Sequence, residues 1–548
     1  MIQNPILPGF HPDPSMIRVN DDYYIVTSSF EWFPGIPLYH SRDLVHWRLV
    51  RNLLNTKEYL DLTGVSPSKG VWAPGLSYCH EEERFYLVYS NVHTKNNWMF
   101  DVDNYLIWTD DLLGEWSKPL YLNSSGFDPY LFHDGDGRKW LLNKDRDFRP
   151  DNMDSRTIVI QEFSADQGAL VGAPVSISSG MTGRGFVEGP VLYKKDAWYY
   201  LFLAEGGTGY GHCVTMGRSR SVTGPYEPCP HNPVLTSSPG DFTASEERPF
   251  MQPELYNPSL ALQKAGHGTL VQTQDGRWYM AHLCGRPVLP QMRCVLGRET
   301  AIQEMEWTTD GWLRVADGSS LPNDRVPAPD LPLHPFPDEA PRCDFSGGVL
   351  PPQFCTVRNE ILPDWVQLSA GEAGLRLRGR ESTASNFALS LIARRLTAFR
   401  AQITTLLRFE PESYHHLAGI TCYYDSSSHY CAYKTYDDRL QTACLTLYGF
   451  VNGRMISYDV SIAIPADAPV YLRADIDLSA LRFFYSLDGK AYIPLGPELD
   501  MTVLSDEAGS DGIFTGTFVG MFAQDTRNKN KWARFDFFEY LPEASAEL

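Results

Sequence analysis

Short apolar runs alternate with polar turn residues throughout the first 315 residues of the chain. The runs are rich in aromatic and β-branched residues, and Asp, Asn and Gly bound them, which is typical of β-strands joined by turns. No long segment with the 3.6-residue period of an amphipathic helix competes with them. The pattern therefore predicts an all-β fold for this part of the chain.

One hairpin pattern recurs five times in these residues. Each copy has a short opening motif, an apolar strand, a polar turn and a second strand that begins with aromatic residues. The copies begin 60, 55, 60 and 79 residues apart, which leaves room for a four-stranded sheet in each. We predict a five-bladed β-propeller; the alternative, a stacked β-solenoid, usually has much shorter repeats. The copies begin at Asp13, Ala73, Asp128, Glu188 and His267.

Equivalent positions of a radial repeat form a ring, so these five residues are expected to meet near the propeller axis. Three of them, Asp13, Asp128 and Glu188, are carboxylates. An Asp at such a place can simply stabilise a turn. Three acids and a histidine around one axis are harder to explain in that way, because like charges brought together cost stability unless function requires them. Prolines on both sides of Asp13, in HPDPS, also restrict its backbone.

The pattern changes after the fifth copy. Seven prolines between residues 322 and 341 predict a stiff, extended connector. From about Cys343, alternating runs such as ALSLIARR and YLRADIDL predict an antiparallel β-sandwich of the jelly-roll or concanavalin type. We therefore divide the chain into a propeller at 1–318, a connector at 319–342 and a sandwich at 343–548.

Charge and composition exclude several classes of partner. The net charge of −20 argues against nucleic acid and against an anionic membrane. No stretch reaches 18 uninterrupted apolar residues, and the first residues lack the pattern of a secretory signal, so we expect a cytoplasmic protein. The ten cysteines contain no CxxC pair, which predicts reduced, mostly buried thiols and no zinc or disulfide framework.

Paired carboxylates without a cofactor motif point first to glycoside hydrolysis. One protonated carboxyl would donate a proton to the leaving oxygen, and an ionised one would activate water or attack the sugar. The third acid then has a physical role, because its charge raises the pKa of the proton donor. The chain has no GxGxxG, GxxxxGK[ST], HExxH or GxSxG motif for the competing chemistries. Phe30 closes the first hairpin and Trp72 directly precedes the second opening motif, and both suit the apolar faces of sugars, although such aromatics are more often core residues.

The chain resembles glycoside hydrolase family 43, in particular its β-xylosidases with a C-terminal sandwich. The matching motifs run from end to end and include NPILPGFHPDPS, GVWAP, GFDPYLFHDGDG, EGPVLYK, LGRETAIQ and FTGTFVG. The resemblance implies a five-bladed propeller and hydrolysis with inversion. It assigns Asp13 as the general base, Glu188 as the general acid and Asp128 as the residue that tunes the acid's pKa. Inversion predicts that the Asp13 and Glu188 carboxyls stand about 6.5–9.5 Å apart.

The resemblance also implies a set of substrate-binding residues. Arg298 matches an arginine that faces the sugar hydroxyls and the tuning Asp128; the alternative is a pair with Glu299 or another surface acid. Phe30 and Trp72 match the walls of the innermost sugar subsite. Phe514 is the candidate for a sandwich phenylalanine that closes the pocket.

His267 matches a channel histidine that ligates calcium in some relatives and only forms hydrogen bonds in others. Calcium prefers clusters of oxygen ligands, and no such cluster is visible in the sequence. We therefore expect no required cofactor, with Ca²⁺ in the propeller channel as the one ion that the resemblance suggests.

The leading hypothesis is an exo-acting, inverting β-xylosidase that releases D-xylose from the non-reducing end of β-1,4-xylo-oligosaccharides, with α-L-arabinofuranosidase side activity. One alternative is a dedicated α-L-arabinofuranosidase. Another, from a different class, is a non-catalytic carbohydrate-binding protein, which would not need a proton donor and a base. By analogy with similar enzymes we expect a homo-oligomer, either a dimer or a tetramer.

Overall fold

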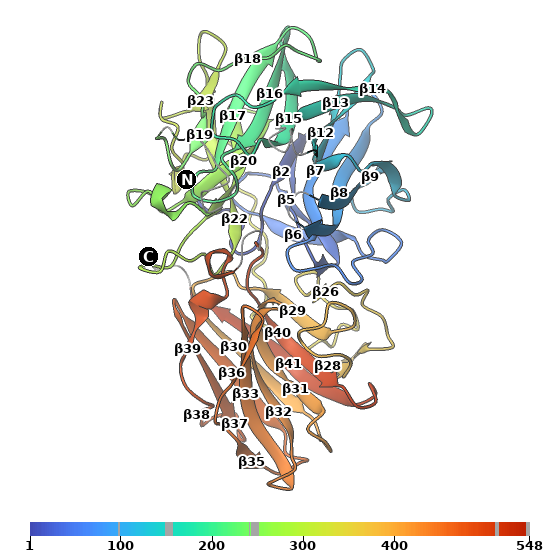
Figure 1. The fold of residues 1–548 in the computed structure, drawn as a ribbon, viewed down its shortest axis with the longest axis vertical. Coiled ribbons are helices and arrows are strands. Elements are labelled where there is room, and N and C mark those ends of the chain that lie inside the picture. The colour runs from blue at the N-terminus through green and yellow to red at the C-terminus, as the bar shows by residue number, and fades with distance from the viewer. Residues whose placement is uncertain are drawn as a thin grey trace.

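The computed structural model places two β-rich domains one above the other (Figure 1). Apart from β-strands, the regular structure includes short 3-10 helices at Pro253–Leu255, Met501–Val503 and Asp506–Ala508. No helix in the described part of the chain is long and apolar enough to cross a membrane. The structure describes residues 1–96, 99–147, 149, 157–240, 242, 251–509 and 514–543.

The upper domain is the predicted five-bladed propeller, so this prediction is confirmed. Each blade is an antiparallel sheet whose strands follow one another in sequence, as expected from the recurring hairpins. The first four blades contact their neighbours through their first strands, whereas β20 of the fifth blade contacts β16 and β17 of the fourth and β2 of the first, which closes the ring. In chain order the blades contain β2 (Ser15–Val19), β3 (Asp22–Val26), β5 (Gly35–Ser41) and β6 (Arg48–Leu54); β7 (Gly70–Cys79), β8 (Arg84–Asn96), β9 (Met99–Thr109) and β10 (Leu120–Asn123); β11 (Gly126–His133), β12 (Lys139–Asp145), β13 (Ile158–Ser164) and β14 (Ala169–Ser178); β15 (Glu188–Lys195), β16 (Trp198–Glu205), β17 (Cys213–Ser219), β18 (Glu227–Pro228) and β19 (Leu235–Thr236); and β20 (Gln263–Gln272), β21 (Trp278–Gly285), β22 (Arg298–Trp307) and β23 (Leu313–Val315).

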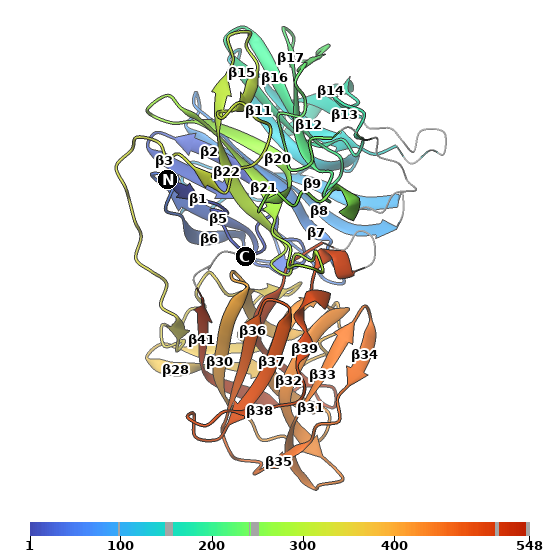
Figure 2. The same ribbon diagram turned by 90° about the vertical axis from the view of Figure 1, so that its left-hand side faces the viewer.

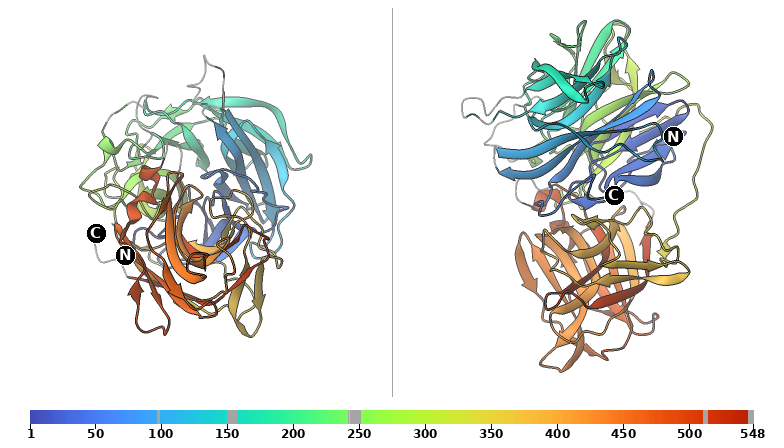
Figure 3. Two further views of the ribbon diagram at one scale, coloured as in Figure 1. Left: turned by 60° about the horizontal axis from the view of Figure 1, so that its bottom comes forward. Right: turned by 90° about the vertical axis from the view of Figure 1, so that its right-hand side faces the viewer.

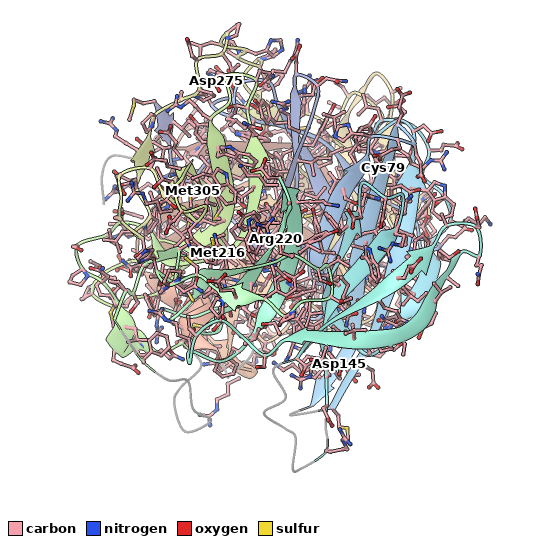
Figure 4. The ribbon with its side chains drawn as sticks, turned by 90° about the horizontal axis from the view of Figure 1, so that it is seen from above. Cys79, Asp145, Met216, Arg220, Asp275 and Met305 are labelled. Atoms are coloured by element: carbon pink, nitrogen blue, oxygen red, sulfur yellow. The ribbon has the colours of Figure 1, made fainter. Side chains whose placement is uncertain are left out.

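Figure 4 looks down on the propeller and shows this arrangement around the ring. Cys79 marks the second blade and Asp145 the third. Met216 and Met305, from the fourth and fifth blades, belong to one buried cluster, so adjacent blades share a core. Packing between blades is therefore what holds the propeller as one domain.

At or just before the first strand of each blade, the equivalent residue has a left-handed backbone conformation. The φ angles are 55° at Asp13, 35° at Ala73, 55° at Asp128, 57° at Gly189 and 51° at His267. In four blades a β-bulge lies at this point, as between Trp72 and Gly75. Such backbone is unusual for residues other than glycine, and it clusters at functional sites.

This common position corrects the predicted register of the fourth repeat. The ring residue of that blade is Gly189, and Glu188 lies one position earlier. Glu188 is therefore equivalent to Trp72 in the second blade and to Phe127 in the third. The predicted start of the fourth copy at Glu188 is therefore one residue too early, because the feature that the copies share is a backbone conformation, which glycine adopts most easily.

The proline-rich connector runs outside the body of the molecule from the propeller to the sandwich (Figure 2). It is fastened to the propeller at several points. β24 (Arg325–Val326) pairs with β1 (Ile2–Gln3), and the backbone N–H of His334 donates to Asp43 Oδ2 at 2.7 Å. The connector therefore behaves as a strap along the propeller and not as a free tether.

The lower domain is a sandwich of two antiparallel sheets (Figure 3), as predicted. Its core is a large cluster of buried aliphatic and aromatic side chains from both sheets. One sheet contains β25 (Arg342–Cys343), β27 (Val366–Ser369), β28 (Glu372–Arg378), β30 (Arg400–Arg408), β36 (Val470–Asp477), β37 (Ala480–Ser486), β38 (Ile493–Pro494), β39 (Leu499–Asp500) and β41 (Trp532–Pro542). The other contains β29 (Ser390–Arg395), β31 (His416–Asp425), β32 (Ser428–Asp437), β33 (Thr442–Val451), β34 (Arg454–Ser457), β35 (Ile462–Ile464) and β40 (Phe518–Asp525).

The two domains share a continuous apolar interface. Buried aromatic residues of the propeller, among them Phe30 and Trp72, form one cluster with Phe514 and Phe518 of the sandwich. Backbone pairing between β4 (Trp32–Phe33) and β26 (Thr356–Val357) reinforces the contact. The interface thus fixes the sandwich against the face of the propeller where the first blades begin.

Candidate active site

A cavity of about 330 Å³ lies where the propeller meets the sandwich. A roomier crevice of about 700 Å³ lies beside the connector, but none of the predicted site residues lines it, so size alone does not identify the site. The smaller cavity brings together the eight residues singled out in the sequence: Asp13, Phe30, Trp72, Asp128, Glu188, His267, Arg298 and Phe514.

Asp13 is buried among groups that favour its ionised form. Its Oδ1 lies 3.5 Å from His267 Nδ1 and 3.4 Å from Arg298 Nη1. Its Oδ2 accepts a hydrogen bond of 2.6 Å from Ser28 Oγ. Burial alone would raise the pKa of Asp13, but Arg298, His267 and Ser28 outweigh burial and hold this pKa well below its usual range. Asp13 is therefore a carboxylate near neutral pH.

Arg298 is almost fully buried beside Asp13. The structure pairs it with Asp13 and not with Glu299, which instead accepts two hydrogen bonds from Arg286 at 2.7 and 2.9 Å. The alternative reading of Arg298 as a partner of Glu299 was therefore wrong. Its Nε and Nη2 have no hydrogen-bond partner among the described residues. Buried donors without partners are costly, so these two atoms are suited to hydroxyl groups of a ligand.

Glu188 and Asp128 occupy the part of the cavity formed by the third and fourth blades. Burial raises the pKa of Glu188, and the charge of Asp128 raises it further. Burial also raises the pKa of Asp128, whose Oδ2 accepts a hydrogen bond of 3.0 Å from the backbone N–H of Gly189. The upward shift is larger for Glu188, so the pair holds a proton on Glu188 near neutral pH.

Two carboxyls with opposite protonation states thus face one cavity. Asp13 can accept a proton from water, whereas Glu188 can donate one to a leaving group. Pairs of titratable groups whose surroundings push their pKa values apart are typical of acid and base assignments in enzymes. The arrangement can therefore support hydrolysis of a bond held between them.

Three aromatic rings from different elements enclose the cavity. The ring centroids of Phe30 and Trp72 are 6.0 Å apart, and Phe514 lies 5.6 Å from Phe30 and 5.9 Å from Trp72. The Arg298 guanidinium lies 5.1 Å from the centroid of Phe514 and 5.6 Å from that of Phe30. A wall of apolar faces beside an arginine suits a sugar, which has C–H faces and hydroxyl edges.

Sequence reasoning missed several residues of the site. Phe100 and Phe127 stack at 5.7 Å next to Trp72, and the guanidinium of Arg146 lies 4.0 Å from the Phe100 centroid. Phe127 precedes Asp128 just as Trp72 precedes Ala73, so the repeat itself held the signal for Phe127. Ser28 had no such signal, because its contact with Asp13 depends on how two strands pair.

Two family models match nearly the whole chain. The model described as glycosyl hydrolases family 43 matches residues 2–313, which include seven of the eight predicted site residues. The model described as the beta xylosidase C-terminal concanavalin A-like domain matches residues 342–541, which include Phe514. The two matches correspond to the propeller and the sandwich seen in the structure.

Similar proteins cover the chain from end to end. A xylan 1,3-beta-xylosidase of a Vibrio species is 42% identical over 98% of this chain and 99% of its own length. A xylosidase/arabinosidase 43B of Humicola insolens is 43% identical over 99% of this chain and 98% of its own. The crystal structure of a xylan beta-1,4-xylosidase from Bacillus halodurans C-125 superimposes with a TM-score of 0.92, at 46% identity, over 99% of this chain and 100% of that one.

Proposed function

Because the chain belongs to glycoside hydrolase family 43, we propose that it is an exo-acting, inverting β-xylosidase that releases D-xylose from the non-reducing end of β-1,4-xylo-oligosaccharides. The similar proteins named as xylosidases support this substrate class. The observation that carries the proposal is the opposite shift in the pKa values of Asp13 and Glu188 within one cavity. A binding protein would gain nothing from this difference.

In the proposed reaction Asp13 is the general base and Glu188 the general acid. Asp13 removes a proton from a water molecule as the water attacks the anomeric carbon, and Glu188 gives its proton to the departing oxygen. The charge of Asp128 keeps Glu188 protonated before the reaction. Arg298 offers its two unpartnered donors to the sugar hydroxyls and holds Asp13 in its ionised form.

The size of the cavity supports exo-action. Its volume of about 330 Å³, with Phe30, Trp72 and Phe514 along its wall, suits a short chain end better than a long stretch of polymer. A closed pocket admits a chain end but not the middle of a polymer. The sandwich is therefore part of the catalytic unit and not a separate binding module.

The proposal needs no metal ion. The described residues contain no group of three or more His, Cys, Asp or Glu side chains that could hold a metal. His267, which the resemblance offers as a possible calcium ligand, directs Nδ1 towards Asp13 and has a raised pKa: burial lowers this pKa, but the Asp13 carboxylate outweighs burial. These residues do not fit the Ca²⁺ site that the resemblance suggested, so we derive no step through it.

Two features of the specificity require direct assay. The Humicola relative is named for both xylosidase and arabinosidase activity, and the Vibrio relative is named for a 1,3 linkage. We propose a preference for nitrophenyl β-D-xyloside over nitrophenyl α-L-arabinofuranoside, and for 1,4-linked over 1,3-linked xylobiose. A larger kcat/KM on the arabinofuranoside would favour a dedicated arabinofuranosidase instead.

The general acid is tested with Glu188→Ala on two substrates. Xylobiose has a poor leaving group that needs protonation, whereas nitrophenol leaves with little help. We expect kcat on xylobiose to fall about 10²–10⁴-fold and kcat on nitrophenyl xyloside to fall much less. Equal losses on both substrates would contradict the role of Glu188, and a wild-type chain that binds xylose but hydrolyses neither substrate would favour a non-catalytic protein.

We further propose that the enzyme acts on short oligosaccharides in the cytoplasm, as a dimer or tetramer. All ten cysteines are free and nine of them are buried, which is consistent with a reducing compartment. Light scattering of the purified protein and fractionation of its source cells test the two parts separately.

A further inference from the structure

The segment of the sandwich that closes the cavity is fixed through two consecutive backbone amides. The N–H of Phe514 donates to Ser68 Oγ at 2.8 Å, and the N–H of Thr515 donates to Tyr424 Oη at 3.0 Å. We propose that Ser68 and Tyr424 are positioning residues that set the place of the Phe514 ring and thereby the affinity of the pocket for its sugar. This inference rests on the proposed function of the same site.

Ser68 connects the two domains at the wall of the pocket. It is fully buried in the loop before β7, and its backbone has a left-handed φ of 60°. Besides accepting from Phe514, it accepts a hydrogen bond of 3.0 Å from Trp72 Nε1 on its carbonyl oxygen. Its N–H donates to the buried carboxyl of Glu31 at 3.1 Å. Ser68 thus contacts both an aromatic residue of the propeller, Trp72, and one of the sandwich, Phe514.

Tyr424 provides the second anchor from within the sandwich. It lies near the end of β31, and its hydroxyl donates to Asp506 Oδ1 at 2.6 Å while it accepts from Thr515. Glu507, which follows Asp506 in the sequence, forms an ion pair with the buried Lys264 of the fifth blade. The anchor therefore depends on a chain of polar contacts that ends in the propeller.

The position of the Phe514 ring affects more than the size of the cavity. The ring faces the Arg298 guanidinium at 5.1 Å, and Arg298 in turn pairs with Asp13. A ring that moved would leave one face of the sugar open to water and would loosen the stack on Arg298. Binding would then have to order this segment each time, which weakens affinity.

The test uses Ser68→Gly and Tyr424→Phe in the full-length chain. Glycine adopts a left-handed φ without strain, so Ser68→Gly removes the hydroxyl without disturbing the backbone. We expect each variant to raise KM for nitrophenyl β-xyloside about 3- to 10-fold, which corresponds to the loss of one hydrogen bond, with kcat changed less than about twofold. The assay uses whichever nitrophenyl glycoside the wild type hydrolyses, so an error in the proposed specificity does not decide the outcome.

A double-mutant cycle separates positioning from general structural damage. In a Phe514→Ala background the two substitutions should change KM by less than about twofold, because the ring that they place is gone. If Phe514→Ala turns over too slowly, calorimetric affinity for D-xylose replaces KM in the same cycle. Equal effects in both backgrounds, or a wild-type KM in Ser68→Gly, would overturn the proposal.

The matched control is Tyr430→Phe. Tyr430 lies on the neighbouring strand β32, does not line the cavity, and donates its hydroxyl to the carbonyl oxygen of Asp500 at 3.2 Å. The chemical change equals that in Tyr424→Phe. We expect a wild-type KM for this control, and an increase equal to that of Tyr424→Phe would also overturn the proposal.

Discussion

The two sides of the cavity contain the same kind of group in different surroundings. On the side formed by the first and fifth blades, Asp13 has an arginine, a histidine and a serine hydroxyl around its carboxylate. On the side formed by the third and fourth blades, Glu188 is buried beside a second acid. We call these sets the base side and the acid side. The contrast shows that the neighbours decide which carboxyl keeps a proton, and not the type of residue.

The propeller provides this contrast through its geometry. The fifth blade closes the ring against the first, so His267 and Arg298 reach Asp13 from the far end of the domain's sequence. The third and fourth blades are adjacent and bring two acids together. The ring of five blades therefore places the cationic side chains beside Asp13 and keeps them apart from the pair of acids, Asp128 and Glu188. No further structural element is needed for this separation.

The largest expected effect comes from removing the base. Asp13→Asn keeps the shape of the side chain but cannot accept a proton, so we expect kcat to fall about 10²–10⁴-fold on nitrophenyl β-xyloside as well as on xylobiose. Steady-state kinetics on both substrates check this result, and D-xylose binding by calorimetry serves as the control for an intact pocket. A fall in kcat of less than about tenfold would contradict the assignment of Asp13 as the base, and with it the difference between the two sides.

A smaller effect is expected from removing the second acid. The charge of Asp128 raises the pKa of Glu188, so Asp128→Asn should lower that pKa. Glu188 would then lose its proton at a lower pH, and the alkaline limb of the kcat/KM profile should move to lower pH. We expect a loss of about tenfold at neutral pH, equivalent to about one pKa unit. An unchanged alkaline limb would show that Asp128 does not tune the acid.

The smallest effect is expected on the base side. Ser28→Ala removes one of the three groups that lower the pKa of Asp13, so this pKa should rise and the acid limb of the profile should move to higher pH. We expect kcat/KM to fall about two- to fivefold, which lies at the lower end of the range for a lost hydrogen bond. Ser41→Ala, in the same blade but outside the cavity, is the control and should match the wild type. If the alkaline limb moved instead, Ser28 would act on the general acid, and the division into a base side and an acid side would be wrong.

Much of the fold could be predicted because the propeller repeats. The hairpin recurs with recognisable spacing, and Asp13 and Asp128 each precede a proline at the start of a first strand. Glu188 shows where this reasoning fails. Its neighbour Gly189 occupies the equivalent position. What the five copies share there is a left-handed backbone conformation, which cannot be read directly from the amino-acid sequence.

Contacts between distant segments could not be predicted from local patterns. Ser28 reaches Asp13 only because the first two strands of the blade pair in one register. Ser68 reaches Phe514 across 446 residues, through the packing of two domains. The family resemblance suggested that Phe514 closes the pocket, but it contained no information on what holds that residue in place.

The sequence by itself determined the architecture and the chemical groups: five hairpin repeats, a sandwich after a stiff connector, three acids and the aromatic residues near them. Only the tertiary structure decided the protonation of those acids and the enclosure of the cavity. The physical reason is that a pKa depends on burial and on charges within a few ångströms. For Asp13 one of those charges belongs to Arg298, which lies 285 residues away in the sequence.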